Sequence, residues 1–344
     1  KEESKMNITL IGLDIAKEVF QLCGVDEKGK VLLKKRLRRH QLLSYVAQLP
    51  AMTIVMEACG GANHWAREFR AMGHEVKLIA PQFVKPFVKG NKTDEKDAEA
   101  IAEAASRAEM RFVSAKTLEQ QDWQSLLRGR ENVVEMRTKL CNHVRGLLAE
   151  YGIVMQMGVH QLRKRLPQLF DLAQDNGLTP MMKKLLSHHY EMLSMFDEEV
   201  ARCDQELREL SRSSEVCERL MTIPGIGVIT AISLVSAIGN GSVFKNGRHF
   251  AAYVGLVPKQ RSSGGREQLL GISKRGDHRL RRLLVQGARS VLLRAGKKTD
   301  PMSRWITTLE TRMHHNKVCV ALANKNARIA LALIKSGESY HLAA

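Results

Sequence analysis

The sequence predicts an α/β N-terminal domain, a long helical middle region and a mainly α C-terminal domain. Short apolar runs alternate with helical patterns up to residue 112, heptad spacing follows, and glycine-interrupted helices fill the last third. Strands and helices place their apolar residues with different periods, so the change of period along the chain marks the change of structure. We place the boundaries at 1–115, 116–215 and 216–344, a division that suits a chain of 344 residues.

The N-terminal elements predict a mixed sheet flanked by helices. Three apolar runs, two of them joined by the turn Asp26–Gly29, are typical of an antiparallel meander. Strands then alternate with helices; Gly73 ends one helix as a C-terminal cap, and Pro81 ends the last strand. The expected elements are strands 8–13, 19–25 and 30–34, helix 40–49, strand 53–56, helix 62–72, strand 75–80 and a helix from Asp94.

The middle region carries heptad repeats. Two apolar rows, beginning at Leu126 and Leu127, recur every seven residues as far as Leu148. A second periodic stretch runs from Leu193 to Leu210, and the basic segment Arg163–Arg165 lies between the two. Heptads indicate that helices pair, but not whether the partner lies in the same chain. A helical hairpin with solvated basic faces and a coiled-coil dimerisation arm that also contacts nucleic acid both stay open.

The charge favours a polyanionic partner and excludes several other classes. The chain has 54 Lys and Arg against 36 Asp and Glu, a formal net charge of +18, which makes nucleic acid the first candidate. Aromatic residues are only 5%, too few for many base-stacking platforms. We find no apolar run of about 18 residues and no apolar signal segment, so we expect neither a transmembrane helix nor secretion. The six cysteines form no CxxC pair, which argues against zinc or disulfides and favours a reducing cytoplasm.

Four carboxylates form a candidate metal site. Asp14 ends the first strand, Glu57 ends the fourth, and Asp94 and Asp97 share one face of a helix because they are three residues apart. If the first and fourth strands are neighbours, all four converge, and they repel one another unless divalent cations neutralise them. Hard oxygen ligands suit Mg²⁺, or Mn²⁺. Each acid also has an ordinary explanation, as a strand end or a first-turn helix residue, so both interpretations stay open.

Two glycine-containing segments in the last third are candidates for contacts with phosphate. Ile223–Gly227 reads helix, tight turn, helix, which is typical of a helix-hairpin-helix that binds phosphate through the backbone at Gly225 and Gly227; an ordinary helix–helix turn is the alternative. The second is a loop, Ser262–Gly265, whose hydroxyl groups would need activation by a base or a metal before attacking phosphorus. The cations expected to form a phosphate-contacting surface around it are Arg261, Arg266, Lys274, Arg275, Arg279, Arg281 and Arg282.

These segments resemble the insertion-sequence "one-ten" transposases. Gly12–Lys17, Met56–Gly60 and Asn91–Ala98 match the DEDD motifs of that family in order, and Ile223–Gly227 and Gly255–Pro258 match its C-terminal domain. The resemblance covers nearly the whole chain, and the "eleven-eleven" subgroup is the most similar.

The resemblance implies a RuvC-like N-terminal domain with an RNase H fold, in which Asp14, Glu57, Asp94 and Asp97 hold the metal. It implies a coiled-coil middle for subunit pairing and a C-terminal domain with a serine that becomes covalently joined to DNA. The family's serine lies five residues beyond the proline of the Gly-Leu-x-Pro motif, which gives Ser263, with Ser262 as the alternative.

The resemblance also implies the partners of the protein. They are donor and target double-stranded DNA, a structured noncoding guide RNA encoded in the same element, and further copies of the chain as a dimer or tetramer. We expect a bacterial, nucleoid-associated protein without a nucleotide cofactor, because the chain has no GxxxxGK[ST] loop. By analogy with other guided systems, base pairing would carry the sequence information.

Three functions remain after this reasoning. The first is an RNA-guided recombinase that works through a phosphoserine. The second is a RuvC-like, metal-dependent nuclease that resolves branched DNA by attack of water, without a covalent intermediate. The third is a non-catalytic nucleic-acid-binding protein with structural acids. A covalent protein–DNA adduct separates the first from the second, and metal-dependent cleavage separates the second from the third.

Overall fold

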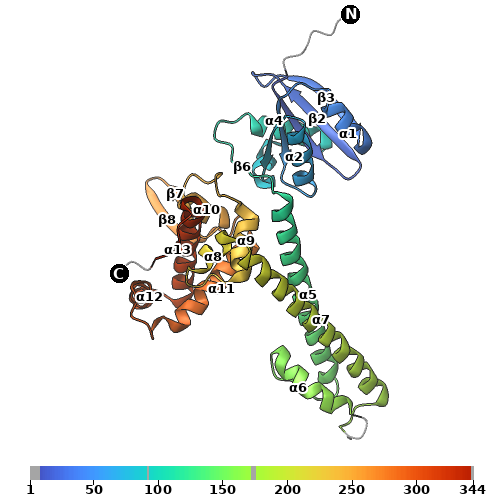
Figure 1. Cartoon of the computed structure of the whole chain (residues 1–344), viewed down its shortest axis with the longest axis vertical. Coiled ribbons are helices and arrows are strands. Elements are labelled where there is room, and N and C mark those ends of the chain that lie inside the picture. The colour runs from blue at the N-terminus through green and yellow to red at the C-terminus, as the bar shows by residue number, and fades with distance from the viewer. Residues whose placement is uncertain (1–7, 91–92, 172–175, 342–344) are drawn as a thin grey trace, which may run out of the picture. The chain divides into compact units, whose positions relative to one another are not determined.

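Two units, Lys1–Glu119 and Gln120–Ala344, make up the computed structural model of the chain (Figure 1). The structure describes residues 8–90, 93–171 and 176–341. Asn91 and Lys92, which begin the third DEDD-like motif, lie outside the described residues. Each unit has apolar cores of its own. The finer division of the second unit into a helical region and a C-terminal domain stays a prediction.

The first unit is built on a six-stranded sheet with the order β3-β2-β1-β4-β5-β6. The first three strands are antiparallel neighbours, β4 runs parallel to both β1 and β5, and β6 pairs antiparallel with β5. The predicted strands and the neighbourhood of the first and fourth are therefore confirmed. The strands are β1 (Leu10–Ile15), β2 (Val19–Val25), β3 (Val31–Arg38), β4 (Thr53–Glu57), β5 (Glu75–Ile79) and the unforeseen β6 (Phe112–Val113).

Helices cover both faces of this sheet. On one face, Trp65 and Phe69 of α2 form an aromatic cluster with Phe20 of β2, with ring centroids 5.1 and 5.8 Å apart in successive pairs. On the other face, Val55 of β4 packs with Ile101 of α4. The expected helices at 40–49, 62–72 and from Asp94 are confirmed within a few residues. The helices are α1 (Arg39–Val46), α2 (Ala62–Ala71), α3 (Pro81–Val84), the 3₁₀ helix η1 (Lys85–Phe87) and α4 (Asp94–Ala105).

A glycine on β1 lets α4 approach the sheet closely. A Cβ atom on Gly12 would lie 2.5 Å from the carbonyl oxygen of Ala98 and 2.6 Å from the backbone nitrogen of Ala102. Both alanines are buried, and larger side chains at this crossing would force the helix outward. This contact fixes the first turn of α4 beside the end of β1.

Two long helices of the second unit run antiparallel to each other. Arg130 of α5 pairs with Asp204 of α7, and Arg137 pairs with Asp197. Residues farther along α5 therefore meet residues nearer the start of α7. Buried residues of both helices, together with those of α6, form one apolar core. The middle helices therefore pair within one chain as a hairpin. The basic segment Arg163–Arg165 lies on α6, where Arg163 pairs with Asp197 and is not simply solvated, and the dimerisation arm stays a prediction. The helices are α5 (Leu118–Ala149), α6 (Val159–Phe170) and α7 (Pro180–Arg212).

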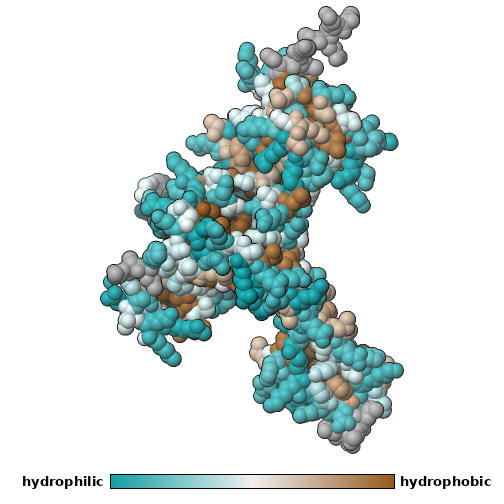
Figure 2. Space-filling view, in the orientation of Figure 1, coloured by the Kyte–Doolittle hydropathy of each residue, from teal (hydrophilic) through white to brown (hydrophobic). Residues whose placement is uncertain are grey.

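The rest of the second unit is mainly helical, as expected. Its core gathers around α13, which buries Val318, Leu322 and Asn326 along its length. Figure 2 shows hydrophilic residues over much of the visible surface, interrupted by apolar patches. None of the helices within the described residues combines the length and apolar character needed to cross a bilayer. The helices are α8 (Glu215–Met221), α9 (Val228–Ile238), α10 (Gly247–Val254), α11 (His278–Ala295), α12 (Pro301–Glu310) and α13 (His315–Ser336).

The serine segment is a β-hairpin, which corrects the expectation of a loop. Strands β7 (Pro258–Ser263) and β8 (Arg266–Ile272) pair antiparallel through a two-residue turn. Gly264 and Gly265 have φ of 57° and 76°, the left-handed pair that tight hairpin turns require. The strands escaped prediction because β7 is polar and the leucines of β8, Leu269 and Leu270, are adjacent, so the alternation of apolar and polar residues is missing.

Candidate functional site

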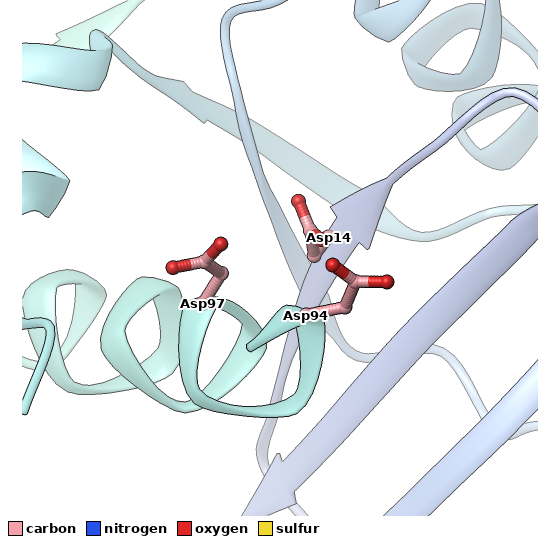
Figure 3. A group of neighbouring side chains, drawn as sticks. All are labelled: Asp14, Asp94 and Asp97. Carbon is pink, nitrogen blue, oxygen red and sulfur yellow. The ribbon is translucent and has the colours of Figure 1, made fainter. Parts of the chain in front are cut away.

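Three carboxylates gather at the end of the central strands (Figure 3). Asp14 lies near the end of β1, and Asp94 and Asp97 lie on the first turn of α4. One carboxylate oxygen from each lies within 4.8 Å of those of the other two. Thr93 begins the helix, and its hydroxyl accepts a hydrogen bond from the backbone N–H of Lys96. The cap therefore fixes the turn that carries both helical aspartates.

Glu57, the fourth predicted acid, lies at the end of the neighbouring strand. Leu13 pairs with Met56 in the parallel register of β1 and β4. Asp14 is the residue after Leu13 and Glu57 is the residue after Met56, so the two acids occupy neighbouring positions on adjacent strands. Within the described residues, the close group of carboxylates comprises the three aspartates and does not include Glu57. The charge of Glu57 nevertheless acts on Asp14, as the electrostatics of the site show.

The site destabilises negative charge on Asp14. Burial, followed by the charges of Asp97, Asp94 and Glu57, raises the pKa of Asp14 from 3.8 to about 6. A divalent cation among these groups would remove both the repulsion and part of the cost of burial. The oxygen-only donor set fits a hard divalent cation.

The contact that brings the acids together was not foreseen. The approach of Gly12 to Ala98 and Ala102 holds α4 against β1, and without it the helical aspartates would lie farther from Asp14. The sequence does carry a signal, a glycine two residues before the first acid and alanines four residues apart on the helix. The sequence alone does not show that these small residues contact one another, because that depends on how β1 and α4 lie in space.

The two serines of the hairpin lie on opposite faces of the ribbon. Ser263 pairs with Arg266, and Arg261 pairs with Gln268, so these four share one face. Ser262 pairs with Glu267 on the other face, where its hydroxyl accepts a hydrogen bond of 2.8 Å from Gln260 Nε2. Ser263 is thus the serine with cationic neighbours, and it precedes the turn at the tip of the hairpin.

The predicted glycine turn lies between α8 and α9. Gly225 has a φ of 90°. The turn packs closely on α11, because a Cβ on Gly287 of that helix would lie 1.9 Å from the carbonyl oxygen of Gly225. Asn326 Nδ2 donates a hydrogen bond of 2.8 Å to the carbonyl of Pro224 and so fixes the turn. An open cavity of about 620 Å³ adjoins it, and its lining includes Gly225, Gly227, Arg130, Arg208, Gln286 and Ser290.

The cations around α11 have different surroundings. Arg281 Nη1 donates to the carbonyls of Val254 and Arg275 at 2.8 and 2.9 Å, so part of this half-exposed guanidinium holds the backbone, and its expected phosphate contact stays a prediction. Arg279 and Arg282 pair with Glu131 of α5. Those that remain exposed to solvent without this pairing are Lys274 and Arg275, and, on the hairpin, Arg261 and Arg266.

Comparisons with known proteins agree on one family. A family model described as "Transposase", of the DEDD type, matches residues 11–153, and the model "Transposase IS116/IS110/IS902 family" matches residues 217–302. The chain is 49% identical to the transposase for insertion sequence element IS1111A of Coxiella burnetii, over all of this chain and 94% of that protein. It is 42% identical to the transposase for IS1328 of Yersinia enterocolitica, over 96% of this chain and 98% of that protein.

The chain is also similar, at lower identity, to a protein named for gene inversion rather than for transposition. The pilin gene-inverting protein of Moraxella bovis is 23% identical over 97% of this chain and 98% of its own length. The match to the first relative spans the sheet, the helical arm and the serine hairpin alike. The chain belongs to the IS116/IS110/IS902 family of insertion-sequence transposases, and it fits the subgroup of IS1111.

Proposed function

We propose that this transposase cuts and rejoins DNA through a phosphoserine at Ser263, assisted by Mg²⁺ at the acidic site and directed by a guide RNA encoded in the same element. The observation that carries the proposal is the convergence of Asp14, Asp94 and Asp97 on one point, which raises the pKa of Asp14. Acids held together against repulsion are typical of a metal-binding catalytic site.

The sheet supports a RuvC-like, RNase H-type fold for the first unit. Three antiparallel strands are followed by two parallel ones, and the first strand lies at the centre. In such a sheet the ends of β1 and β4 meet, and the helix α4 crosses beside them. That arrangement explains why acids far apart in sequence form one site.

Asp14, Glu57, Asp94 and Asp97 would hold the metal. A divalent cation held there would polarise a phosphodiester and would lower the pKa of an attacking hydroxyl. The chain itself supplies the rigid frame: Gly12 keeps α4 close to β1, and Thr93 begins the helix at the correct turn. Mn²⁺ offers the same preference for oxygen ligands and is the alternative cation.

Ser263 is the better nucleophile of the two serines because its face of the hairpin is cationic. Its Oγ would form a bond to phosphorus while the bond from phosphorus to the leaving oxygen of the DNA breaks, and the proton of the hydroxyl is passed to that oxygen. Arg261 and Arg266 would stabilise the added negative charge on the phosphoryl oxygens. Reversal by a hydroxyl of another strand rejoins the DNA without ATP, since one phosphate ester replaces another at each step.

Nucleic acid would be bound mainly through its backbone. The turn with Gly225 and Gly227 would act as a helix-hairpin-helix beside the cavity, with Arg130 and Arg208 in its lining. The exposed cations Lys274 and Arg275, and the pair Arg279 and Arg282, would contact further phosphates. A guide RNA that supplies sequence recognition leaves the protein to bind charge and shape, which suits a net charge of +18.

An exposed apolar stripe on α7 supports self-association through the helical arm, as in a coiled coil. Its apolar members are Met181, Leu185, Met192 and Met195, and with the polar His188 between them the positions alternate in steps of four and three residues. Met181 is 83% exposed and Met195 67%. An antiparallel pairing of two copies would place Leu185 opposite Met195 and Lys184 beside Glu198.

The test uses purified protein with its co-purified RNA, Mg²⁺ and labelled DNA that carries the junction of the element. A DNA band that is shifted under denaturing conditions and sensitive to protease would be the covalent adduct. We expect Ser263→Ala to abolish it and Ser262→Ala to retain it. Loss of the adduct with Ser262→Ala alone would move the nucleophile by one residue. Free cleaved DNA from wild type and both variants would favour a nuclease that uses water.

A further inference from the structure

Two arginines of α11 share one carboxylate. Arg279 Nε donates to Glu131 Oε2 at 2.7 Å, and Arg282 Nη2 donates to the other oxygen, Oε1, of the same group. Glu131 belongs to α5, so the contact joins α5 to the first turns of α11 within the second unit. Each oxygen of the carboxylate therefore has its own guanidinium partner, a geometry in which a single anion bridges two cations.

The burial of these three side chains is unequal. The side chain of Glu131 is 19% exposed, whereas those of Arg279 and Arg282 are 45% and 53% exposed. The acid thus lies beneath two guanidinium groups that stay open to solvent. Guanidinium groups bind carboxylates and phosphates through the same hydrogen-bond geometry, so this pair suits a phosphate as well as the carboxylate.

The charge in this place is not balanced. Two arginines face one glutamate, and the exposed Lys274 and Arg275 precede the same helix. Arg281 fixes that approach by donating to the carbonyl of Arg275. The local potential is therefore positive even with Glu131 in place, and it draws a polyanion toward the two arginines.

We infer that Arg279 and Arg282 form a binding site for a backbone phosphate of nucleic acid, and that Glu131 occupies this site as an internal competitor in the free protein. The inference rests on the proposed DNA-binding function. When a phosphate takes the arginines, the released carboxylate is solvated and gathers a cation from solution. That uptake opposes the release of counterions from the DNA, so Glu131 lowers both the affinity and its dependence on salt.

The test compares the full-length wild type with Glu131→Gln and with Glu135→Gln, whose exposed acid lies one turn farther along α5. Fluorescence anisotropy with a labelled duplex of unrelated sequence measures affinity at several KCl concentrations. We expect Glu131→Gln to bind about two- to fivefold more tightly at low salt, because a partly exposed ion pair is weak. Its plot of log affinity against log salt should be steeper by about one. Glu135→Gln should match the wild type in slope.

A double-mutant cycle ties the effect to the arginines. Replacing Arg279 and Arg282 by Gln should remove more affinity in the Glu131→Gln background than in the wild type, because Glu131 already reduces their contribution. If Glu131→Gln unfolds, Glu131→Asp takes its place: it keeps the charge but is one methylene too short to bridge both arginines, and we expect a smaller gain. Equal affinity and equal slope in folded Glu131 variants would overturn the inference. Failure of the wild type to bind any duplex would instead overturn the proposed function.

Discussion

The folded structure disfavours the ionised form of Asp14. Its pKa is raised from 3.8 to about 6, so the folded protein binds a proton there more tightly than the unfolded chain does. The contribution of Asp14 to the stability of the metal-free protein is therefore fully present below about pH 4 and is lost as the pH rises through about 6. Because Asp14 is only partly buried, we discount the full effect to about 1–2 kcal/mol at pH 7.

We therefore expect Asp14→Asn to stabilise the protein in EDTA at pH 7 and to abolish stabilisation by MgCl₂. In the wild type, stabilisation by MgCl₂ should weaken below pH 6, where protons compete with the cation. Thermal unfolding at pH 5 and pH 7, with and without Mg²⁺, measures both effects, and Glu27→Gln on the exposed turn after β2 is the control. An Asp14→Asn protein that is less stable in EDTA would mean that the acid has a structural role.

Single residues were predictable where their chemistry is local. The four acids stand out in the sequence because they end strands or begin a helix, and the structure brings three of them within 4.8 Å. The backbone hydrogen bonds of Arg281 were not foreseen, because its bonds to the carbonyls of Val254 and Arg275 come from a fold that brings three segments together. The finding that Ser262 and Ser263 lie on opposite faces of the hairpin depends on its strand register, which the resemblance alone did not supply.

At the scale of elements, the position of α4 decides whether the acids converge. A Cβ on Gly12 would meet the backbone of α4 at Ala98 and Ala102, which cannot yield as a flexible side chain would. We expect Gly12→Ala to cost about 1–3 kcal/mol of folding stability and to displace the helix. Stabilisation by Mg²⁺ should fall with it although every acid is intact, and Gly60→Ala, which meets open space, should change neither. Unchanged Mg²⁺ binding by Gly12→Ala would show that the helix position is not what assembles the site.

The helical arm gives a second prediction at this scale. If two α7 helices pair antiparallel along the stripe that contains Leu185 and Met192, Lys184 of each copy lies beside Glu198 of the other. Lys184→Glu or Glu198→Lys alone should then weaken self-association about two- to fivefold at low salt, and the double variant should restore it. Analytical ultracentrifugation measures the association. Additive losses in the double variant would mean that these two residues do not meet.

Elements with strong periodicity were predictable, and those without it were not. Strands β1 to β5 and the helices α5 and α7 follow from apolar spacing, because burial selects apolar residues on one face. The hairpin β7–β8 has no buried face, since all its residues except Ile272 are exposed, including Leu269 and Leu270. Its formation depends on the two glycines at positive φ, and a Gly-Gly pair within a polar segment is equally typical of a loop.

For the whole molecule, charge sets how tightly and how selectively nucleic acid is held. Most of the net charge of +18 lies in the second unit, where 34 Lys and Arg face 20 Asp and Glu, so most cations there contribute a general field and a few make direct contacts. The proposed direct contacts come from Arg261, Arg266, Lys274, Arg275 and the pair Arg279 and Arg282, which share one phosphate, so about five phosphates would be neutralised. Uptake of a cation by the released Glu131 makes the slope of log affinity against log salt shallower by about one, which predicts about −4. Affinity for duplex DNA should then fall about 10²- to 10³-fold between 50 and 200 mM salt, in titrations followed by anisotropy. Replacing Lys274 and Arg275 by Ala should make the slope shallower by about two, while the same change at Lys28 and Lys30, on the turn between β2 and β3, should leave it unchanged. A flat titration would mean that the excess positive charge serves some purpose other than holding a phosphate backbone.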